Sequence, residues 1–296
     1  MFRQQSKNMG IRRMQWKVGR VKITKVVELE TVGSTRFILP LASNEEIQKQ
    51  PWLIPHFATE EGRLKMSIHS LVVETPSRRI VVDTGLGNDK QGRNVPTWNN
   101  RSDPFLEKLT AAGFAPDSID TVLCTHLHVD HVGWNTRLEN GRWVPTFPNA
   151  RYVFDKTEFD YWTETNAKAE VPPFVDSVLP VVEAKRAELV GNDFAIGDHM
   201  RILPTPGHTP GHLAFTFGRG KDDAVFAGDL MHSPIQTLYP ELSPKFDVDP
   251  AQAAKTRRSF LERYCDTDTL CCPAHFPSPS VGKIRRKGNG FVCETA

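Results

Sequence analysis

The residues best suited to chemistry lie together in the stretch CTHLHVDHVG, residues 124–133. His126 and His128 are two positions apart, so in an extended chain their side chains fall on the same side and can bind one ion. Asp130 and His131 follow at a turn, which can direct them toward a second ion. Imidazole nitrogens and carboxylate oxygens are the ligands that zinc-type cations prefer, and catalytic sites leave one position open for water.

A single histidine is more often a core or surface residue than a metal ligand. Four candidate ligands within six positions are a different matter. Burying imidazole and carboxylate groups without partners costs free energy that apolar residues would not cost. The cluster therefore predicts a metal centre.

Three further candidate ligands stand at the ends of predicted strands. His208 follows a strand at 201–205, Asp229 ends a strand at 223–229, and His275 ends the last strand, in CCPAHF. Side chains at the ends of separate strands can converge at one rim of a pair of sheets. We therefore expect these three residues to join the first four.

The elements that must position these residues are short and punctuated by turns. Apolar or alternating runs predict strands at 18–30, 67–75, 78–85, 119–126, 150–155, 201–205, 212–218, 223–229 and 268–275. Helices are predicted at 103–113, 156–163, 174–189 and 250–264. Strands in runs with interleaved helices favour two sheets packed face to face with helices outside.

Composition excludes several classes of partner. The chain has 296 residues, with 37 Lys and Arg against 35 Asp and Glu, so nothing predicts electrostatic capture of nucleic acid or of an anionic membrane. It has no apolar run of membrane-spanning length, and its five cysteines form no paired C-x-x-C motifs, which favours a reduced, cytoplasmic setting. We expect a flexible basic tail at 1–17, a single domain at 18–296 and a small-molecule substrate, and the sequence leaves a homodimer open.

Taken in order, these residues resemble the metallo-β-lactamase-fold hydrolases, most closely the branch of methyl parathion hydrolase and N-acyl homoserine lactonase. The motifs are H-x-H-x-D-H at 126–131, the later His208, Asp229 and His275, and VVDTG with Asp83. The resemblance implies an α/β (α+β) fold, an αββα sandwich of two mixed β-sheets packed face to face with helices outside. It also implies two divalent metal ions, Zn²⁺ in the first place, with Mn²⁺, Co²⁺ or Fe²⁺ as alternatives.

The same resemblance implies which residues hold the ions and which support them. Seven ligands divide between two cations: His126, His128 and His208 for one, Asp130, His131 and His275 for the other, and Asp229 as the bridge. Asp83 would lie behind the site and orient a ligand imidazole. His212 has no ligand position in this scheme, so we expect it to pack behind the ligands.

The implied reaction is hydrolysis by a metal-bridging hydroxide of a lactone, a carboxyl ester or a phosphotriester. Asp130 is the predicted proton shuttle. The dinuclear lactonases carry a tyrosine three residues after the bridging aspartate, where this chain has His232. Because a histidine can also donate a hydrogen bond or protonate an alkoxide, we predict His232 as the second catalytic residue.

Aromatic residues in the predicted loops indicate a fairly hydrophobic substrate. The residues expected to line its pocket are Trp52, Phe57, Trp98, Trp134, Tyr239 and Phe276. Other functions on the same fold stay open, namely an iron-dependent oxidoreductase, a thioesterase, and a metal-retaining ligand-binding protein with little turnover.

Overall fold

The computed structural model describes residues 14–33, 35–197, 199–219 and 221–295. Most of the predicted basic tail, residues 1–17, lies outside the described residues. Its last part belongs to the first strand, β1 (Gln15–Val18), which pairs antiparallel with β2 (Val21–Val32). That residues 18–296 form one domain stays a prediction.

The first large sheet has seven strands in the spatial order β1-β2-β3-β4-β5-β8-β9. Its first four strands pair antiparallel, and β4, β5, β8 and β9 pair parallel. After β1 and β2 its strands are β3 (Lys65–Glu74), β4 (Arg79–Val82), β5 (Thr121–Leu123), β8 (Arg151–Asp155) and β9 (Ala187–Val190).

The second large sheet also has seven strands, in the order β10 to β16. All neighbours pair antiparallel except β13 and β14, which pair parallel. The strands are β10 (Ala195–Ile196), β11 (Met200–Pro204), β12 (Leu213–Phe217), β13 (Ala224–Gly228), β14 (Leu270–Pro273), β15 (Gly282–Lys287) and β16 (Gly290–Thr295). A separate hairpin joins β6 (Thr136–Glu139) to β7 (Arg142–Pro145).

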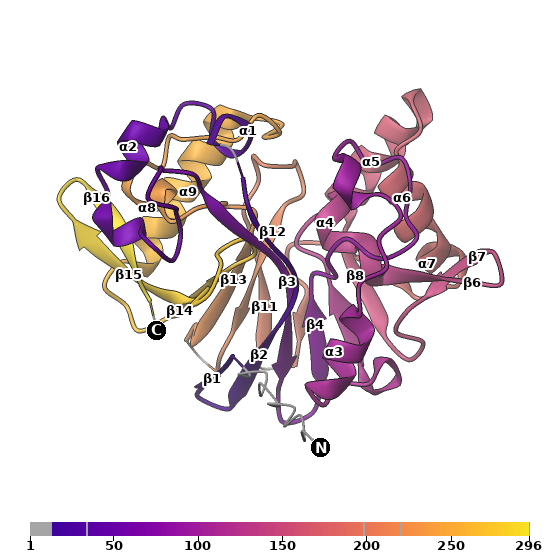
Figure 1. The fold of residues 1–296 in the computed structure, drawn as a ribbon. Helices are drawn as coiled ribbons and strands as arrows, with labels where there is room; N and C mark the ends of the chain where they lie inside the picture. The colour runs from indigo at the N-terminus through magenta and orange to yellow at the C-terminus, as the bar shows by residue number, and fades with distance from the viewer. Residues whose placement is uncertain (1–13, 34, 198, 220, 296) are drawn as a thin grey trace, which may run out of the picture.

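Helices cover the outer faces of both sheets (Figure 1). Those beside the first sheet are α3 (Phe105–Ala111), α4 (Val129–Val132), α5 (Lys156–Lys168), α6 (Pro172–Ser177) and α7 (Leu179–Glu183). Those beside the second are α1 (Thr35–Ile38), α2 (Asn44–Gln48), α8 (Ile235–Leu238) and α9 (Pro250–Tyr264). Short 3₁₀ turns are η1 (Pro51–Leu53), η2 (Pro96–Trp98), η3 (Pro116–Ser118) and η4 (Gly133–Asn135). This arrangement confirms the predicted mixed α/β sandwich.

Three buried apolar clusters correspond to the three interfaces between these layers. The middle cluster joins the two sheets, and includes Leu71 and Val73 of the first sheet and Phe215 and Phe226 of the second. A second cluster lies beneath the helices of the first sheet, and a third beneath those of the second. The hydrophobic effect of this burial is what holds the four layers together.

The predicted helix at 174–189 is wrong. The chain forms two short helices, α6 and α7, and then the strand β9, which pairs parallel with β8. Pro180, near the start of α7, has no N–H to continue a helix through this point. The predicted helix at 250–264 is confirmed as α9, where Asp249 accepts a hydrogen bond from the backbone N–H of Gln252.

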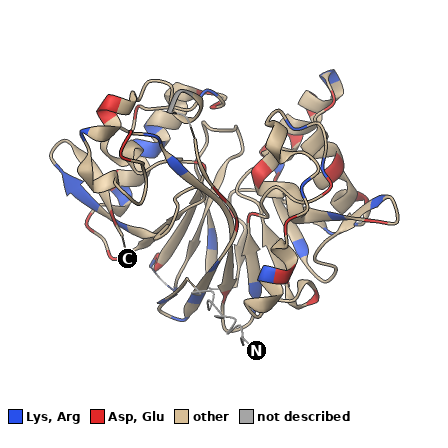
Figure 2. Cartoon of the chain, in the orientation of Figure 1, with Lys and Arg blue, Asp and Glu red and all other residues tan. Residues whose placement is uncertain are grey.

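Basic and acidic residues are interspersed along the chain in both halves of the molecule (Figure 2). Among the described residues, the structure contains no helix with both the length and the apolar character needed to cross a membrane.

Candidate metal centre

The stretch 124–133 changes direction at the point where its ligand side chains occur. His126 and His128 follow β5 in an extended chain, and His128 has φ −70° and ψ 160°, just before α4. The single turn of α4 then carries Asp130 and His131. One short segment therefore presents its first two candidate ligands and its last two in different directions, as its spacing predicts.

The other three candidate ligands come from the second sheet. His208 follows β11, Asp229 follows β13 directly, and His275 lies two residues beyond β14. These three strands run in the same direction, because β12 pairs antiparallel with both β11 and β13 while β14 is parallel to β13. Their carboxyl ends therefore meet at one edge of the sheet.

The carboxylate of Asp229 is the centre of the group. Its Oδ2 lies 3.2 Å from Nε2 of His208 and 3.7 Å from Nε2 of His126. Its Oδ1 lies 2.9 Å from Nε2 of His275 and 3.1 Å from Nε2 of His131. Each carboxylate oxygen thus faces a different pair of imidazoles.

The seven predicted ligands form two groups that could each hold a cation. Within each group the ligand atoms lie within 4.8 Å of one another. The groups are His126, His128, His208 and Asp229, and Asp130, His131 and His275, while a third group of Asp229, His232 and His275 overlaps both. The six ligands other than Asp229 lie together as the resemblance implied, and their binding of metal stays a prediction.

Buried polar atoms in this centre have no hydrogen-bond partner among the described residues. They include Nε2 of His126, Nε2 of His131 and Oδ1 of Asp229. Leaving such atoms unpaired is costly, and a divalent cation that prefers nitrogen and carboxylate ligands would satisfy all three. The donor set therefore fits two divalent cations.

Four of the histidines have Nδ1 held by an acceptor, so that Nε2 is the ring nitrogen facing Asp229. The Nδ1 atoms lie 2.9 Å from Oδ2 of Asp83 for His131, 2.7 Å from Oδ1 of Asp247 for His208, 3.1 Å from the carbonyl of Ser67 for His275, and 3.1 Å from Oγ1 of Thr125 for His126. Carboxylate and carbonyl oxygens only accept, so Nδ1 carries the proton. Such contacts fix ring orientation in metal sites.

Asp83 occupies the supporting position that was predicted for it. Besides His131, its carboxylate accepts hydrogen bonds from the backbone N–H and the hydroxyl of Thr125, at 2.8 and 2.9 Å. Its φ of 53° is unusual for a residue with a side chain. Asp83 therefore connects β4 to both ends of the ligand-bearing segment.

His212 also lies behind the ligands, as predicted. Its Nε2 accepts a hydrogen bond from the backbone N–H of Asp229 at 3.0 Å, and its Nδ1 lies 2.8 Å from Oγ1 of Thr205. Burial lowers the pKa of His212 to about 3, so the ring is neutral. Because both ring nitrogens are already used, His212 orients the backbone of Asp229.

Asp247, which supports His208, was not among the predicted site residues. Asp247 is buried in the loop between α8 and α9, and Oδ2 of its carboxylate lies 3.6 Å from the guanidinium of the buried Arg257. Arg257 donates to the carbonyls of Leu230, Pro240 and Leu242. Its local sequence, FDVD at 246–249, has no ligand spacing that would distinguish Asp247.

Charge is distributed unevenly within the centre. Burial lowers the pKa values of His126 and His128 well below the usual range, so both rings are neutral ligands. Burial alone would raise the pKa of Asp229, but the surrounding imidazoles, with His131 first, hold it well below its usual value. The central carboxylate is therefore ionised.

His232 contacts the centre in a different way from the predicted ligands. Its Nε2 lies 3.1 Å from Oδ2 of Asp229, and its ring stacks on that of His275 with centroids 5.3 Å apart. Its buried Nδ1 has no hydrogen-bond partner among the described residues. An unpaired acceptor costs less than an unpaired N–H, so Nε2 carries the proton and points into the centre.

The predicted aromatic pocket is largely wrong. Phe57, Trp134 and Phe276 are buried in the apolar clusters, where they seal the core. The other predicted residues, Trp52, Trp98 and Tyr239, are half-buried, with Trp52 and Tyr239 packed against the apolar cluster of the second sheet, and their place in a substrate pocket stays a prediction. The aromatic rings that contact the histidines of the centre are Trp162, 5.5 Å from His128, and Phe246, 5.8 Å from His208 and 5.2 Å from His232.

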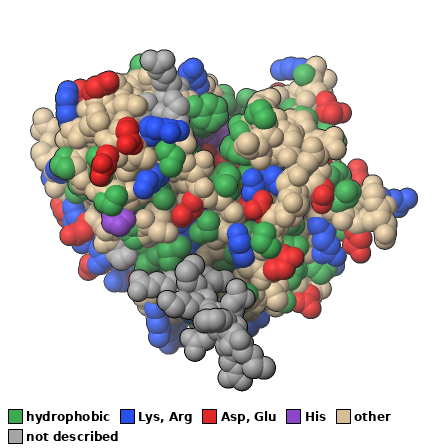
Figure 3. Space-filling model, viewed as in Figure 1, with side chains coloured by type: hydrophobic (Ala, Val, Ile, Leu, Met, Phe, Trp, Pro, Cys, Tyr) green, Lys and Arg blue, Asp and Glu red, His purple; other side chains and the backbone are tan. Residues whose placement is uncertain are grey.

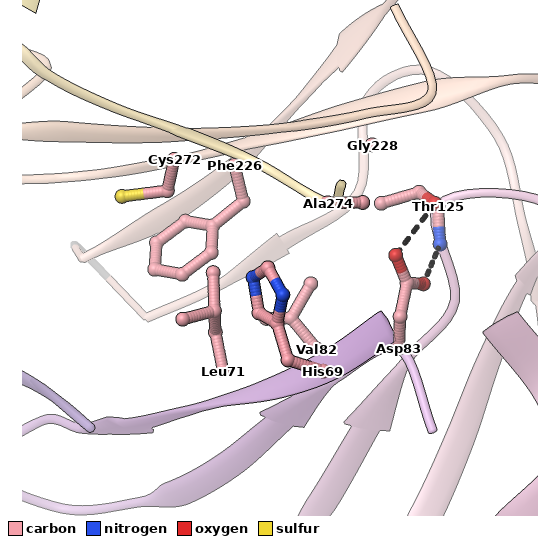
Figure 4. Close-up of a pocket in the computed structure, with 9 residues that line it drawn as sticks. All are labelled: His69, Leu71, Val82, Asp83, Thr125, Phe226, Gly228, Cys272 and Ala274. Carbon is pink, nitrogen blue, oxygen red and sulfur yellow. Dashed lines mark hydrogen bonds between the residues drawn. The ribbon is translucent and has the colours of Figure 1, made fainter. Parts of the chain in front are cut away.

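His128 and Asp130 are the half-exposed members of the predicted ligand set. A cavity of only about 10 Å³ lies behind Asp83, between the sheets (Figure 4), which is room for about one water. Its lining residues are His69, Leu71, Val82, Asp83, Thr125, Phe226, Gly228, Cys272 and Ala274. On the opposite side, Figure 3 shows histidine atoms in a hollow between the two halves, bordered by hydrophobic side chains.

Comparison with known proteins identifies the family. The sequence model of the metallo-beta-lactamase superfamily matches residues 65–275, well over half of the chain. The chain belongs to this superfamily, as its ligand motif predicted.

Among curated relatives, the N-acyl homoserine lactonase of Bacillus thuringiensis is 24% identical over 161 residues, which cover 50% of this chain and 57% of the lactonase. The hydroxyacylglutathione hydrolase of Synechococcus sp. is 31% identical over 130 residues, covering 44% of this chain and 40% of that enzyme. The chain thus spans little more than half the length of the lactonase. The lactonase relative agrees with the predicted lactonase-like branch.

Two solved structures share the whole architecture. AidC, a dizinc quorum-quenching lactonase in complex with a product, superimposes with a TM-score of 0.78 at 22% identity, over 95% of this chain and 96% of its own. The hydrolase AbOPH superimposes with a TM-score of 0.79 at 24% identity, over the same shares of the two chains. At these identities the likeness establishes the fold.

Proposed function

We propose that this protein is a metal-dependent hydrolase of lactones, carboxyl esters or phosphotriesters. The observation that carries the proposal is the position of Asp229 between two groups of ligands, with one carboxylate oxygen facing each group. Zinc is the metal that we propose, because the donors are imidazoles and carboxylates in a buried site. When bound, two such cations would lower the pKa of water and polarise the oxygen of the scissile group.

The residues of the chain would divide the remaining tasks. Asp130 is the most accessible of the carboxylates in the centre, and Oδ2 lies 3.6 Å from Nε2 of His275. We assign it to accept a proton from the attacking water. His232 presents Nε2–H beside Asp229 and would donate a hydrogen bond from it to the leaving oxygen. Asp130 would then pass the proton taken from water to that oxygen, so the ring of His232 stays neutral throughout.

The apolar part of the substrate would lie against Phe246. This ring is 36% exposed although it contacts two histidines of the centre, and it lies 6.3 Å from the ring of Phe37, which is 53% exposed. Exposed aromatic rings beside a reactive centre favour a substrate with a hydrophobic group. Relatives named as lactonases support a lactone with an acyl chain as the first candidate.

One experiment tests the reaction. Protein loaded with two equivalents of zinc, manganese or cobalt is assayed against lactones, aryl esters, phosphotriesters and thioesters, the last because one relative is named a hydroxyacylglutathione hydrolase. We expect turnover of at least one ester class, and its loss in His126→Ala. His56→Ala, which alters an exposed histidine, is the matched control. Fully loaded protein that hydrolyses none of these substrates would contradict the proposal.

A further inference from the structure

Two buried glutamates outside the ligand set make the same unusual set of contacts. Glu28 is 3% exposed and Glu158 is 1% exposed. Each carboxylate accepts hydrogen bonds from two backbone N–H groups and from the indole N–H of one tryptophan. Burying a carboxylate costs free energy unless both its oxygens accept hydrogen bonds, and these contacts supply those bonds.

Glu158, in the first turn of α5, connects two ligand-bearing segments that come from different sheets. Its Oε1 accepts from the backbone N–H of Leu127 at 3.1 Å, and Leu127 lies between His126 and His128. Its Oε2 accepts from the backbone N–H of Gly211 at 3.1 Å, in the segment that carries His208.

The third donor to Glu158 extends this contact to a ligand ring. The indole N–H of Trp162 donates to Oε1 at 2.7 Å, and the ring of Trp162 lies edge-on to His128 with centroids 5.5 Å apart. Gly211 is needed for the approach, because a Cβ at this position would overlap the backbone nitrogen of Glu158. One carboxylate thus sets the spacing between the two segments that supply the first ligand group.

Glu28, on β2, makes the equivalent contacts beside the other ligand group. Its Oε2 accepts from the backbone N–H of Leu86 at 2.6 Å, and its Oε1 from that of Gly87 at 3.2 Å and from the indole of Trp134 at 2.9 Å. Leu86 and Gly87 follow Asp83, which holds Nδ1 of His131. Glu28 therefore supports the segment that orients a ligand of the second group.

We propose that Glu158 is a positioning residue for the cation site of His126, His128 and His208, and that Glu28 is its counterpart for the site of Asp130, His131 and His275. This inference rests on the metal centre of the proposed function. Neither carboxylate touches the ligand atoms themselves. Each acts by holding the backbone that carries or orients those ligands.

The chemistry of the contacts makes the proposal specific to a carboxylate. Both oxygens must accept, because every contact described above comes from an N–H donor. A glutamine of the same shape has one accepting oxygen, and its amide NH₂ would face an N–H group. Substitution by glutamine should therefore release one of the attached segments without leaving a cavity.

The test uses the full-length variants Glu158→Gln and Glu28→Gln, titrated with Zn²⁺ against a chromogenic chelator and with Co²⁺ by visible absorption. We expect each variant to keep one tight site and to lose about 10- to 100-fold in affinity at the other, the range for outer contacts of metal ligands. Glu164→Gln, an exposed position on the same helix α5, is the matched control and should keep both sites.

A second substitution identifies which site has weakened. In the Glu158→Gln background, His208→Ala should leave the tight site in place, whereas His275→Ala should remove it. In the Glu28→Gln background the two effects should be exchanged. Two tight sites in both glutamine variants, or equal weakening of both sites in each, would overturn the proposal.

The proposal can still be tested if a glutamine variant does not fold. If Glu158→Gln does not give a folded protein by circular dichroism, Gly211→Ala disturbs the same contact from the other segment and should weaken the same site. Because the readout is cation binding without substrate, it is independent of the reaction. A wild-type protein that binds two cations but hydrolyses no ester would contradict the proposed function and leave this inference intact.

Discussion

The two halves of the metal centre are built in different ways. The first sheet supplies four candidate ligands from one short segment, 126–131, directly after β5. The second sheet supplies three from the ends of β11, β13 and β14, over the range 208–275. Local chain geometry positions the first set, whereas strand order positions the second. Asp229 is where the two halves meet, because its two oxygens face ligands from both.

The substitution with the largest expected effect removes this junction. We expect Asp229→Asn to weaken both cation sites and to lower kcat/KM by more than about 100-fold. Replacing a residue that only hydrogen-bonds a metal ligand already lowers metal affinity or activity by about 10- to 100-fold. Metal content after dialysis and ester hydrolysis measure the two effects. Asp160→Asn, on the surface of α5, is the control. Retention of two tightly bound cations in Asp229→Asn would show that the halves are independent.

A smaller loss, confined to turnover, is expected at His232. Its Nε2–H faces the centre while its Nδ1 lacks the acceptor that the four histidines holding Nδ1 contacts possess. We therefore expect His232→Ala to bind two cations and to lose about 100-fold in kcat, the lower range for removal of one hydrogen-bond donor to a developing oxyanion. His232→Tyr should recover part of this, since a phenol also donates. Loss of a cation from His232→Ala would instead make His232 a ligand.

A change at Phe246 should alter substrate preference alone. The ring borders the centre from the half that carries His208 and His232. We expect Phe246→Ala to lower kcat/KM about tenfold for substrates with long acyl chains and little for acetyl esters, as removal of apolar contact does in other enzymes. Equal losses for both substrates would remove Phe246 from the substrate site.

The last effect is on stability alone, with no expected effect on turnover, and concerns the half that carries Asp83. Lys90 is fully buried, with Nζ 2.6 Å from Oγ1 of Thr136 and 3.6 Å from the carboxylate of Asp176. Burial lowers its pKa from 10.5 to about 7. Between these values the unfolded chain binds more protons than the folded one, so the free energy of unfolding should rise with pH.

The change should be on the order of a few kcal/mol across the window from pH 7 to pH 10.5. The destabilisation caused by the buried, charged ammonium group of Lys90 is fully present below pH 7. Urea denaturation of wild-type protein and Lys90→Met at pH 7, 8 and 9 measures how the free energy of unfolding changes with pH. The variant should show a flatter pH dependence, and identical slopes for the two proteins would contradict this account.

Regular elements and strand ends were predictable because their signals are local. Apolar alternation located most strands, and Asp249 with Pro250 located the start of α9. The structure of residues 174–189 was not predictable in this way, because its apolar residues suit either a helix or a strand. Pairing with β8, which only the folded chain provides, decided that Ala187–Val190 is a strand.

The aromatic residues show the same limit at the substrate site. Trp134 lies in η4 and Phe276 in the loop after β14, yet both are buried, and Trp134 donates to Glu28 on a distant strand. Phe246 was not selected, although it contacts the centre. Whether a loop aromatic seals the core or borders a site depends on where its loop packs. The neighbouring residues in the sequence do not determine where the loop packs.

The amino-acid sequence by itself determined the ligand types, the order of the ligands along the chain and the sandwich that carries them. It did so because ligand spacing and apolar periodicity act over a few residues. Only the tertiary structure decided how the ligands are held. Asp247 reaches His208, and Glu158 joins the segments of Leu127 and Gly211, through contacts between parts of the chain that are far apart in sequence. Those contacts form only when the two sheets pack together.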